Sequence, residues 1–258
     1  NNFDTPQPPD FGLTLTGGGS TDIFGEGKLG AIASAKWGTS WREQERIQRS
    51  YADFQGAPVL RDDFVENRTD FNADIGTLVT VKAAWENHEV ASNTFYAHQT
   101  QQRTELETGF TSRSQRGDVR SFLLSWIERE LIAQQLTGSN DFDFLRIDYR
   151  GMFAAAGRNA PDRREYQYFD AEPQDGTFVV FGNSGMSRQW DTVDDRVWSF
   201  GLDMTFPILD ADDQWLGLEA KTGGAGFWQD RDTVRRLYRW RPDPETGADT
   251  RQNNPALR

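Results

Sequence analysis

A few acidic residues have types and spacings that catalysis or metal binding would require. Glu128 and Glu130 are two residues apart, so a strand would place both carboxylates on one face, as acid–base catalysis needs. Charge that lines a pore or its rim is the simpler interpretation of this pair. Asp210, Asp212 and Asp213 offer the oxygen ligands that calcium prefers. A solvated turn is the simpler interpretation of these aspartates, and we predict no metal site there.

Other groups that catalysis uses are sparse. The chain has two histidines, His88 and His98, and no cysteine, which excludes a histidine-rich metal site and thiol chemistry. Gly17–Gly19 lacks the context of a phosphate-binding loop. Gly223–Gly224 and Gly226 favour a kink or a close approach of strands over a nucleotide site. We find no nucleophile paired with a base, and we predict that the chain is not an enzyme and carries no cofactor.

The order that does run through the sequence is an alternation of apolar and polar residues. The cleanest run has large apolar residues at every second position from Trp198 to Phe206. Less regular runs begin near Phe11, Leu29, Ile75, Leu145 and Leu216. A period of two is that of a strand with one apolar and one polar face. We predict an all-β fold, an antiparallel up-and-down meander of about eight long strands.

Two of the predicted strands have less regular faces. Glu89–Glu105 is polar on both faces beyond its first half. Arg120–Thr137 carries large apolar residues in both phases of the alternation, so the pattern does not assign its faces. A β-bulge within this segment is one reason for such a change of phase.

The lengths of the connections alternate along the chain. Short turns are predicted near residues 20–26, 87–88, 138–141 and 209–214, and long connections near 42–68, 111–119 and 158–189. Transmembrane barrels have this rhythm, with short turns on the periplasmic side and long loops outside. The predicted strands also exceed the roughly 9 to 11 residues that a tilted strand needs to cross hydrocarbon. We therefore predict that residues 1–258 form one partial transmembrane barrel domain.

In a barrel, the two faces of each strand meet different surroundings. The residues predicted to face lipid are Leu29, Ala31, Ala33, Val79, Val81, Trp85, Leu145, Ile147, Tyr149, Trp198, Phe200, Leu202, Met204, Phe206, Leu216 and Leu218. The residues predicted to face the lumen are Lys82, Arg146, Asp148, Arg150, Asp203, Glu219 and Lys221. Outer loops are the expected recognition surface, and Tyr166, Tyr168 and Phe169 are our candidates for ligand contact there.

Aromatic residues lie near both ends of the predicted strands. Trp85 and Phe206 are close to short turns, whereas Trp37, Trp198 and Trp228 are near the opposite strand ends. Membrane barrels carry aromatic girdles at both membrane interfaces. The placement therefore favours a membrane barrel over an ordinary soluble sandwich.

Composition excludes several classes of protein. The chain has 28 Lys+Arg against 40 Asp+Glu, a net charge of -12, which argues against nucleic acid as a partner because phosphate needs a basic surface. An aromatic content of 13% argues against disorder. No apolar run is long enough to predict a transmembrane helix. The first residue is Asn rather than Met and both ends are predicted to lie outside, so we expect a piece of a longer protein.

Several segments of the chain resemble parts of a known family. Ser125–Leu131, continuing to Gln135–Gly138, resembles a barrel strand of the TonB-dependent outer-membrane receptors. Arg158–Tyr166 resembles the point where such a strand leaves into an outer loop. Pro9–Leu13 followed by Leu29–Ala31 resembles an early hairpin of the same barrels. The resemblance covers most of the chain, and its motifs mark barrel strands rather than ligand residues.

The resemblance implies a 22-stranded barrel in the bacterial outer membrane, filled by an N-terminal plug that this sequence does not match. The chain would be a middle third of that barrel, in contact with outer-membrane lipid and lipopolysaccharide. The family takes up scarce, bulky nutrients by coupling to TonB–ExbB–ExbD through the plug region. Siderophore-bound iron, cobalamin and oligosaccharides are all open as the ligand.

Three other functions are compatible with parts of the pattern. A passive porin or small outer-membrane barrel would have no plug and no energy coupling. A secreted β-sandwich binding module would be soluble without detergent and would pack two apolar faces into a core. An outer-membrane hydrolase would need a nucleophile and a base that we do not find in the sequence.

Overall fold

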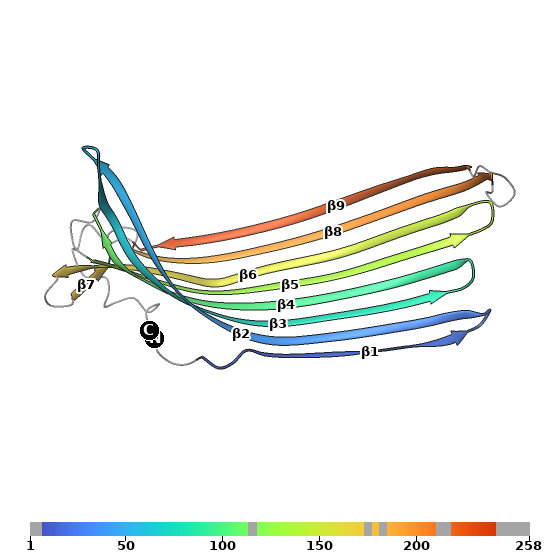
Figure 1. Ribbon diagram of the computed structural model, residues 1–258, viewed down its shortest axis with the longest axis horizontal. Coiled ribbons are helices and arrows are strands. Elements are labelled where there is room, and N and C mark those ends of the chain that lie inside the picture. Colours follow the sequence, from blue (N-terminus) through green and yellow to red (C-terminus); the bar gives the residue numbers. More distant parts are fainter. Residues whose placement is uncertain (1–6, 113–117, 173–176, 181–184, 210–217, 241–258) are drawn as a thin grey trace.

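The chain folds into a single antiparallel sheet. The computed structural model describes residues 7–112, 118–172, 177–180, 185–209 and 218–240, and these contain no helix. The strands are β1 (Phe11–Ile23), β2 (Gly27–Phe54), β3 (Ala57–Ala84), β4 (His88–Thr111), β5 (Asp118–Asp141), β6 (Arg146–Glu172), β7 (Thr177–Val180), β8 (Met186–Leu209) and β9 (Leu218–Arg239). The eight long strands pair in chain order, and the short β7 adds to β6 (Figure 1). The prediction of an all-β meander of about eight long strands is confirmed.

The register of the strands places most large apolar side chains on one face of the sheet and most charged side chains on the other. Direct partners such as Tyr149 and Leu202, or Trp198 and Trp228, carry the apolar alternation from strand to strand. We call this face the belt face and the opposite one the polar face. All residues predicted to face lipid that lie within described strands share the belt face, and all the predicted lumen-facing residues share the polar face. That the belt face meets lipid remains a prediction.

Three residues of the predicted lipid-facing set lie outside the strands. Trp85 follows β3 in a turn, where its indole Nε1 donates a hydrogen bond to the carbonyl oxygen of Phe24 at 3.1 Å. Leu145 precedes β6 in the next turn at the same end of the sheet. Leu216 lies outside the described residues.

The turns at one end of the sheet are short, as predicted, but they are displaced. Residues 24–26, 85–87 and 142–145 connect the strand pairs there. The predicted turn at 138–141 is wrong, because β5 continues through it to Asp141. The start of the predicted turn at 20–26 likewise belongs to β1, and His88 belongs to β4. The predicted turn at 209–214 lies almost entirely outside the described residues.

The long loop predicted at 42–68 is wrong. Residues 42–54 and 57–68 continue β2 and β3, and only Gln55 and Gly56 form the connection. Both have positive φ, 56° and 82°, which is the conformation of a type I′ hairpin turn and matches the twist of paired strands. Figure 1 shows this hairpin rising away from the other strands at the end opposite the short turns.

The other long connections are also partly strand. Most of the predicted loop 158–189 belongs to β6, β7 and β8, because backbone pairing continues through it. Tyr166, Tyr168 and Phe169 are therefore strand residues of β6 rather than loop residues. Of the predicted loop 111–119, residues 113–117 lie outside the described residues.

The irregularity expected in Arg120–Thr137 lies in the neighbouring strand. β5 pairs with β4 without interruption, so a bulge within β5 is wrong. Instead, the pairing of β6 shifts against both β5 and β8 around Ala160–Arg163. Pro161 has no N–H to donate to the ladder, and proline within sheets is confined to edges, strand starts and bulges.

The described residues form one layer without a core of their own. The buried hydrophobic residues among them are Val119 and Ala160, whereas Phe200 is 68% exposed and Trp228 is 71% exposed. β1 and β9 each have a neighbouring strand on one side only within the described sheet. A sheet normally buries its apolar face against another layer, so the belt face requires a partner or an apolar solvent.

Candidate functional site

The belt face carries aromatic side chains that pack on one another and on glycine. The Trp198 ring centroid lies 5.4 Å from that of Phe153 and 5.9 Å from that of Trp228. A Cβ on Gly226 would lie 2.7 Å from the ring of Phe200, so the ring occupies the space above this glycine. The close approach predicted at Gly226 is confirmed, because the Phe200 ring of the neighbouring strand lies over this glycine.

The belt face has a polar interruption where β4 and β5 meet. Gln134 accepts a hydrogen bond from Thr94 and donates one from Nε2 to Ser92 Oγ at 2.8 Å. These bonds satisfy both ends of the amide on an otherwise apolar surface. Glu128 and Glu130 also lie on this face by register, on the opposite side of the sheet from the residues predicted to face the lumen. The alternation in this segment is too mixed for the sequence to have shown which face they take.

Near the short turns, the polar face carries cross-strand ion pairs. Lys82 Nζ lies 2.6 Å from Glu89 Oε2, and Arg150 Nη1 lies 2.6 Å from Asp203 Oδ2. Arg146 pairs across strands with Asp141 at 3.0 Å, and Lys221 pairs within β9 with Glu219 at 3.4 Å. Most of the predicted lumen-facing residues therefore occupy paired positions, and exposed pairs of this kind contribute little to stability.

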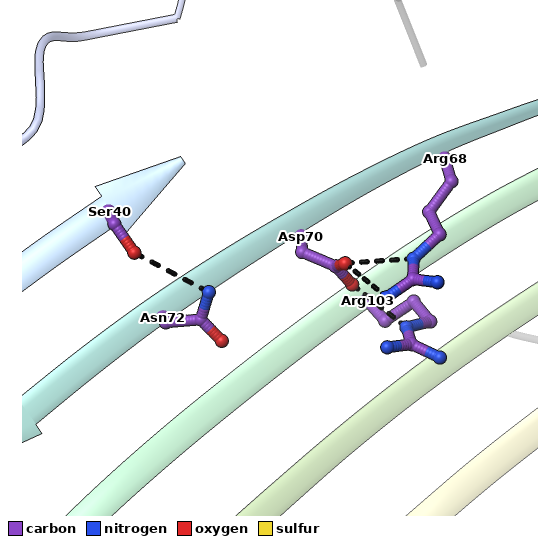
Figure 2. A network of polar contacts seen from close by, with 5 residues as sticks. All are labelled: Ser40, Arg68, Asp70, Asn72 and Arg103. Carbon is purple, nitrogen blue, oxygen red and sulfur yellow. Dashed lines mark hydrogen bonds and ion pairs between the residues drawn. The ribbon is translucent and has the colours of Figure 1, made fainter. Parts of the chain in front are cut away.

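Farther along the polar face, Asp70 is the centre of a stronger network (Figure 2). Its carboxylate accepts hydrogen bonds at 2.8 Å from Nε of Arg68 on the same strand and at 2.8 Å from Nε of Arg103 on β4. Asp70 is only 4% exposed. Asn72, two residues along, reaches Ser40 of β2 at 3.5 Å, so the polar contacts join β2, β3 and β4.

An excess of carboxylates adjoins this network in the part of β4 beyond the apolar belt. Glu66, which pairs with Arg46, lies directly opposite Glu107, and Arg68 lies opposite Glu105. Burial raises the pKa of Glu107, and the neighbouring Glu105 and Glu66 raise it further. Burial and Glu66 also raise the pKa of Glu105, against the opposing effect of the nearby arginines. Charge repulsion is therefore built into the polar face here.

We expect Glu107→Gln to stabilise the protein by about 0.2 to 1 kcal/mol near pH 7, because it removes a like charge directly opposite Glu66. A carboxyl group with a raised pKa in the folded state makes the wild type lose stability as the pH rises through that pKa. The variant should therefore approach the wild type at about pH 3, well below the ordinary pKa of glutamate, where Glu107 is largely protonated in both the folded and unfolded states and carries little charge to remove. Urea unfolding at both pH values measures this difference. A variant less stable than the wild type near pH 7 would contradict the expected repulsion.

A second set of charges lies where β8 meets β9. Arg231 contacts Asp195 Oδ2 through Nε at 3.1 Å, and Gln229 donates to the same carboxylate at 2.8 Å. Asp191 lies 4.0 Å from Arg158 and 3.7 Å from Arg235, and its Oδ1 has no hydrogen-bond partner within the described residues. Two carboxylates of β8 therefore face arginines of β9 on the polar face.

Between these two sets, the polar face contains a cavity of about 550 Å³. It extends across strands from β3 to β8, and Arg129 and Arg158 contribute the cationic side chains that line it. Ala97, Leu131 and Ala156 contribute small or apolar side chains in one cross-strand row. A concave site with an apolar surface and a few polar groups is the usual form of a ligand site. None of these residues was predicted from the sequence to belong to a ligand site, because their proximity depends on strand register.

The predicted ligand contacts lie apart from this cavity. Tyr166 and Tyr168 fall on the belt face of β6, beyond the bulge at Pro161, and the side chain of Phe169 lies outside the described residues. Near them, Arg188 donates from Nε and Nη2 to Asp162 at 3.0 and 2.9 Å. The guanidinium carbon of Arg188 lies 5.0 Å from the Trp190 ring. This end of the belt face therefore combines cationic and aromatic groups.

Among the residues that the structure describes, no three His, Cys, Asp or Glu side chains gather as metal ligands. His88 contacts Asn140 through Nδ1 at 3.1 Å, and His98 contacts Thr100 through Nε2 at 3.3 Å. Asp210, Asp212 and Asp213 lie outside the described part of the chain. No helix in the described part is long and apolar enough to cross a membrane.

In comparisons with known proteins, the chain matches no family model, no curated protein and no solved structure.

Proposed function

We propose that this chain is part of the barrel of an outer-membrane receptor that takes up a scarce, bulky nutrient. The observation that carries the proposal is the single-layered sheet. Its belt face is apolar and aromatic and is covered by no other described layer, and its polar face is charged. Lipid would cover the belt face, and an aqueous lumen would solvate the polar face, as in transmembrane barrels. Further strands would pair with β1 and β9, because a lipid-exposed sheet edge leaves backbone groups without hydrogen bonds.

The extent of the belt supports the proposal. Trp198 and Phe206 mark the ends of the apolar run on β8 and are eight residues apart, or roughly 26 Å along the strand at the usual rise. With a tilt of roughly 40° this is about 20 Å along the membrane normal, most of the roughly 25 Å height of a barrel's apolar band. β2 and β3 are each 28 residues long, so both would extend far beyond the membrane. Long projecting strands suit a receptor that captures its ligand outside the cell.

The proposal that uptake is driven by energy from TonB rests on the resemblance to TonB-dependent receptors. A plug elsewhere in the complete protein would contact TonB–ExbB–ExbD, and binding outside would precede a plug rearrangement. Arg188 and Trp190 on the belt face, beyond the apolar run, would contact the phosphate and sugar groups of lipopolysaccharide. Siderophore-bound iron, cobalamin and oligosaccharides remain the candidate nutrients.

The test is to express the complete gene product in a Gram-negative host and follow it in two ways. Membrane fractionation should place the protein in the outer membrane. Uptake of a labelled nutrient that the protein supports should disappear in a host that lacks TonB. Uptake that persists without TonB would favour a passive porin. Recovery in the soluble fraction would exclude both membrane functions and favour a secreted binding module.

We also expect the isolated chain 1–258 to aggregate in the absence of detergent. An open sheet exposes both edge strands and an apolar face, each of which favours association with other copies. Size-exclusion chromatography coupled to light scattering, with and without detergent, would measure the association. A monodisperse monomer without detergent would contradict the assignment of the belt face to lipid.

A further inference from the structure

The cavity on the polar face contains two arginines that face each other across neighbouring strands. Arg129 of β5 is the direct cross-strand partner of Arg158 of β6, and both line the cavity. Like charges directly opposite each other destabilise a sheet. An anion bound between the two guanidinium groups would relieve this repulsion.

The described residues supply no carboxylate within hydrogen-bond distance of either guanidinium group. Arg129 Nη1 donates to the neutral amide oxygen of Gln99 at 3.2 Å, and Arg129 forms no ion pair with any described residue. The nearest carboxylate contact of Arg158 is to Asp191, at 4.0 Å. By contrast, Asp70 and Asp195 each accept hydrogen bonds from at least one arginine on this face.

Other acids near the cavity do not fill this role. Asp195 is already held by Arg231 at 3.1 Å. Asp74 lies in the same cross-strand row as Arg129 but is two strands away, roughly 10 Å at the usual strand spacing. Glu130 lies on the belt face of β5, because successive side chains of a strand point to opposite faces.

The part of the cavity beside the arginines is lined by apolar side chains, most of them short. Ala97, Leu131 and Ala156 are direct partners in the next row of the polar face, and all three line the cavity. Their small or aliphatic side chains leave room for the body of a ligand above the sheet. The site therefore suits a molecule with an anionic group at one end and an apolar part beside it.

We propose that Arg129 and Arg158 bind the carboxylate or phosphate group of a small ligand whose apolar part lies over Ala97, Leu131 and Ala156. Guanidinium groups match the geometry of both anions through paired hydrogen bonds. The inference deepens the proposed function, because it names the chemical class of nutrient that the lumen would contact, and it rests on that function for the identity of the polar face as the lumen.

The experiment measures binding of benzoate, phenyl phosphate and neutral benzamide to the complete protein in detergent micelles by isothermal calorimetry. Benzoate or phenyl phosphate should bind saturably and benzamide should not. Arg129→Gln and Arg158→Gln should each weaken anion binding by about tenfold or more, because each loses charge-assisted hydrogen bonds. Arg129→Lys, which keeps the charge, should give an intermediate loss. Arg49→Gln removes the same charge from a remote pair with Asp63 and should bind like the wild type.

Two outcomes would overturn the anion site. One is equal binding of benzoate and benzamide. The other is that the wild type binds neither anion and the Arg129→Gln variant melts at a lower temperature than the wild type. That result would mean that an acidic side chain elsewhere in the complete protein fills the site. Fractionation of the same samples separates this failure from failure of the proposed function. An outer-membrane protein without anion binding overturns the site alone, whereas anion binding by a soluble protein overturns the membrane function alone.

Discussion

Replacing Asp70 with Ala is expected to destabilise the complete protein by about 3 kcal/mol, at the lower end of the range for removing one partner of a buried ion pair. Asp70 is 4% exposed and accepts hydrogen bonds from both Arg68 and Arg103. Its removal takes away the carboxylate that both guanidinium groups bind, and only the more distant charge of Glu105, opposite Arg68, remains beside them within the described network. The loss should not reach the upper end of that range, because the side chains of Arg68 and Arg103 are 27% and 30% exposed and retain some hydration.

Urea unfolding of the reconstituted protein measures this loss, and Asp74→Ala is the matched control. Asp74 lies four residues along β3 on the same face but forms no ion pair with any described residue. Its replacement should therefore change stability by less than about 0.5 kcal/mol. Asp70→Asn should fall between the two, since its amide oxygen still accepts one hydrogen bond but carries no charge. Equal losses for Asp70→Ala and Asp74→Ala would show that the network contributes nothing specific.

The strands inside the apolar belt could be predicted from the sequence because their alternation is local. Every second residue from Trp198 to Phe206 is large and apolar, and a strand is the conformation that places them all on one face. The register then follows largely from matching apolar faces, because a slip of one residue would exchange the two faces. This is why the predicted lipid-facing and lumen-facing residues of the described strands separate cleanly in the structure.

The outer halves of the strands could not be predicted in the same way. Residues 42–54 and 57–68 are polar on much of both faces, so no apolar alternation distinguishes them from a loop. Their strand conformation depends on cross-strand pairs such as Arg46 with Glu66 and on the two-residue turn at Gln55–Gly56. That turn was the available signal, since a glycine between polar runs of equal length is typical of a tight hairpin.

The cavity depends on register even more strongly. Arg129 and Arg158 are 29 residues apart in the sequence and become neighbours only through the pairing of β5 with β6. That pairing runs without a shift from the turn at residues 142–145, so it depends on where this turn falls, and the sequence prediction placed the turn at 138–141. The apolar residues that obscured the faces of β5 also have an explanation, because Leu131 lies on the polar face beside the two arginines.

Replacing Leu202 with Arg is expected to destabilise the complete protein in a lipid bilayer by about 2 to 4 kcal/mol, the range for a cation on the lipid face near the midplane of a barrel. Leu202 lies between Phe200 and Met204 in the apolar run of β8, opposite Tyr149, and is 40% exposed. An arginine there would have to leave water for hydrocarbon or distort the bilayer around it. Denaturant unfolding in lipid vesicles measures the loss.

Ser199→Arg provides the matched control for Leu202→Arg. Ser199 is three residues away on β8 and faces the polar side, where a cation would remain in water, so its replacement should change stability by less than about 1 kcal/mol. The comparison separates the effect of the face from that of an added charge. Equal losses for the two variants would mean that lipid does not cover the belt face. A loss confined to Leu202→Arg would instead support a lipid-facing belt, because in a soluble sheet an arginine at a 40% exposed site would keep its hydration.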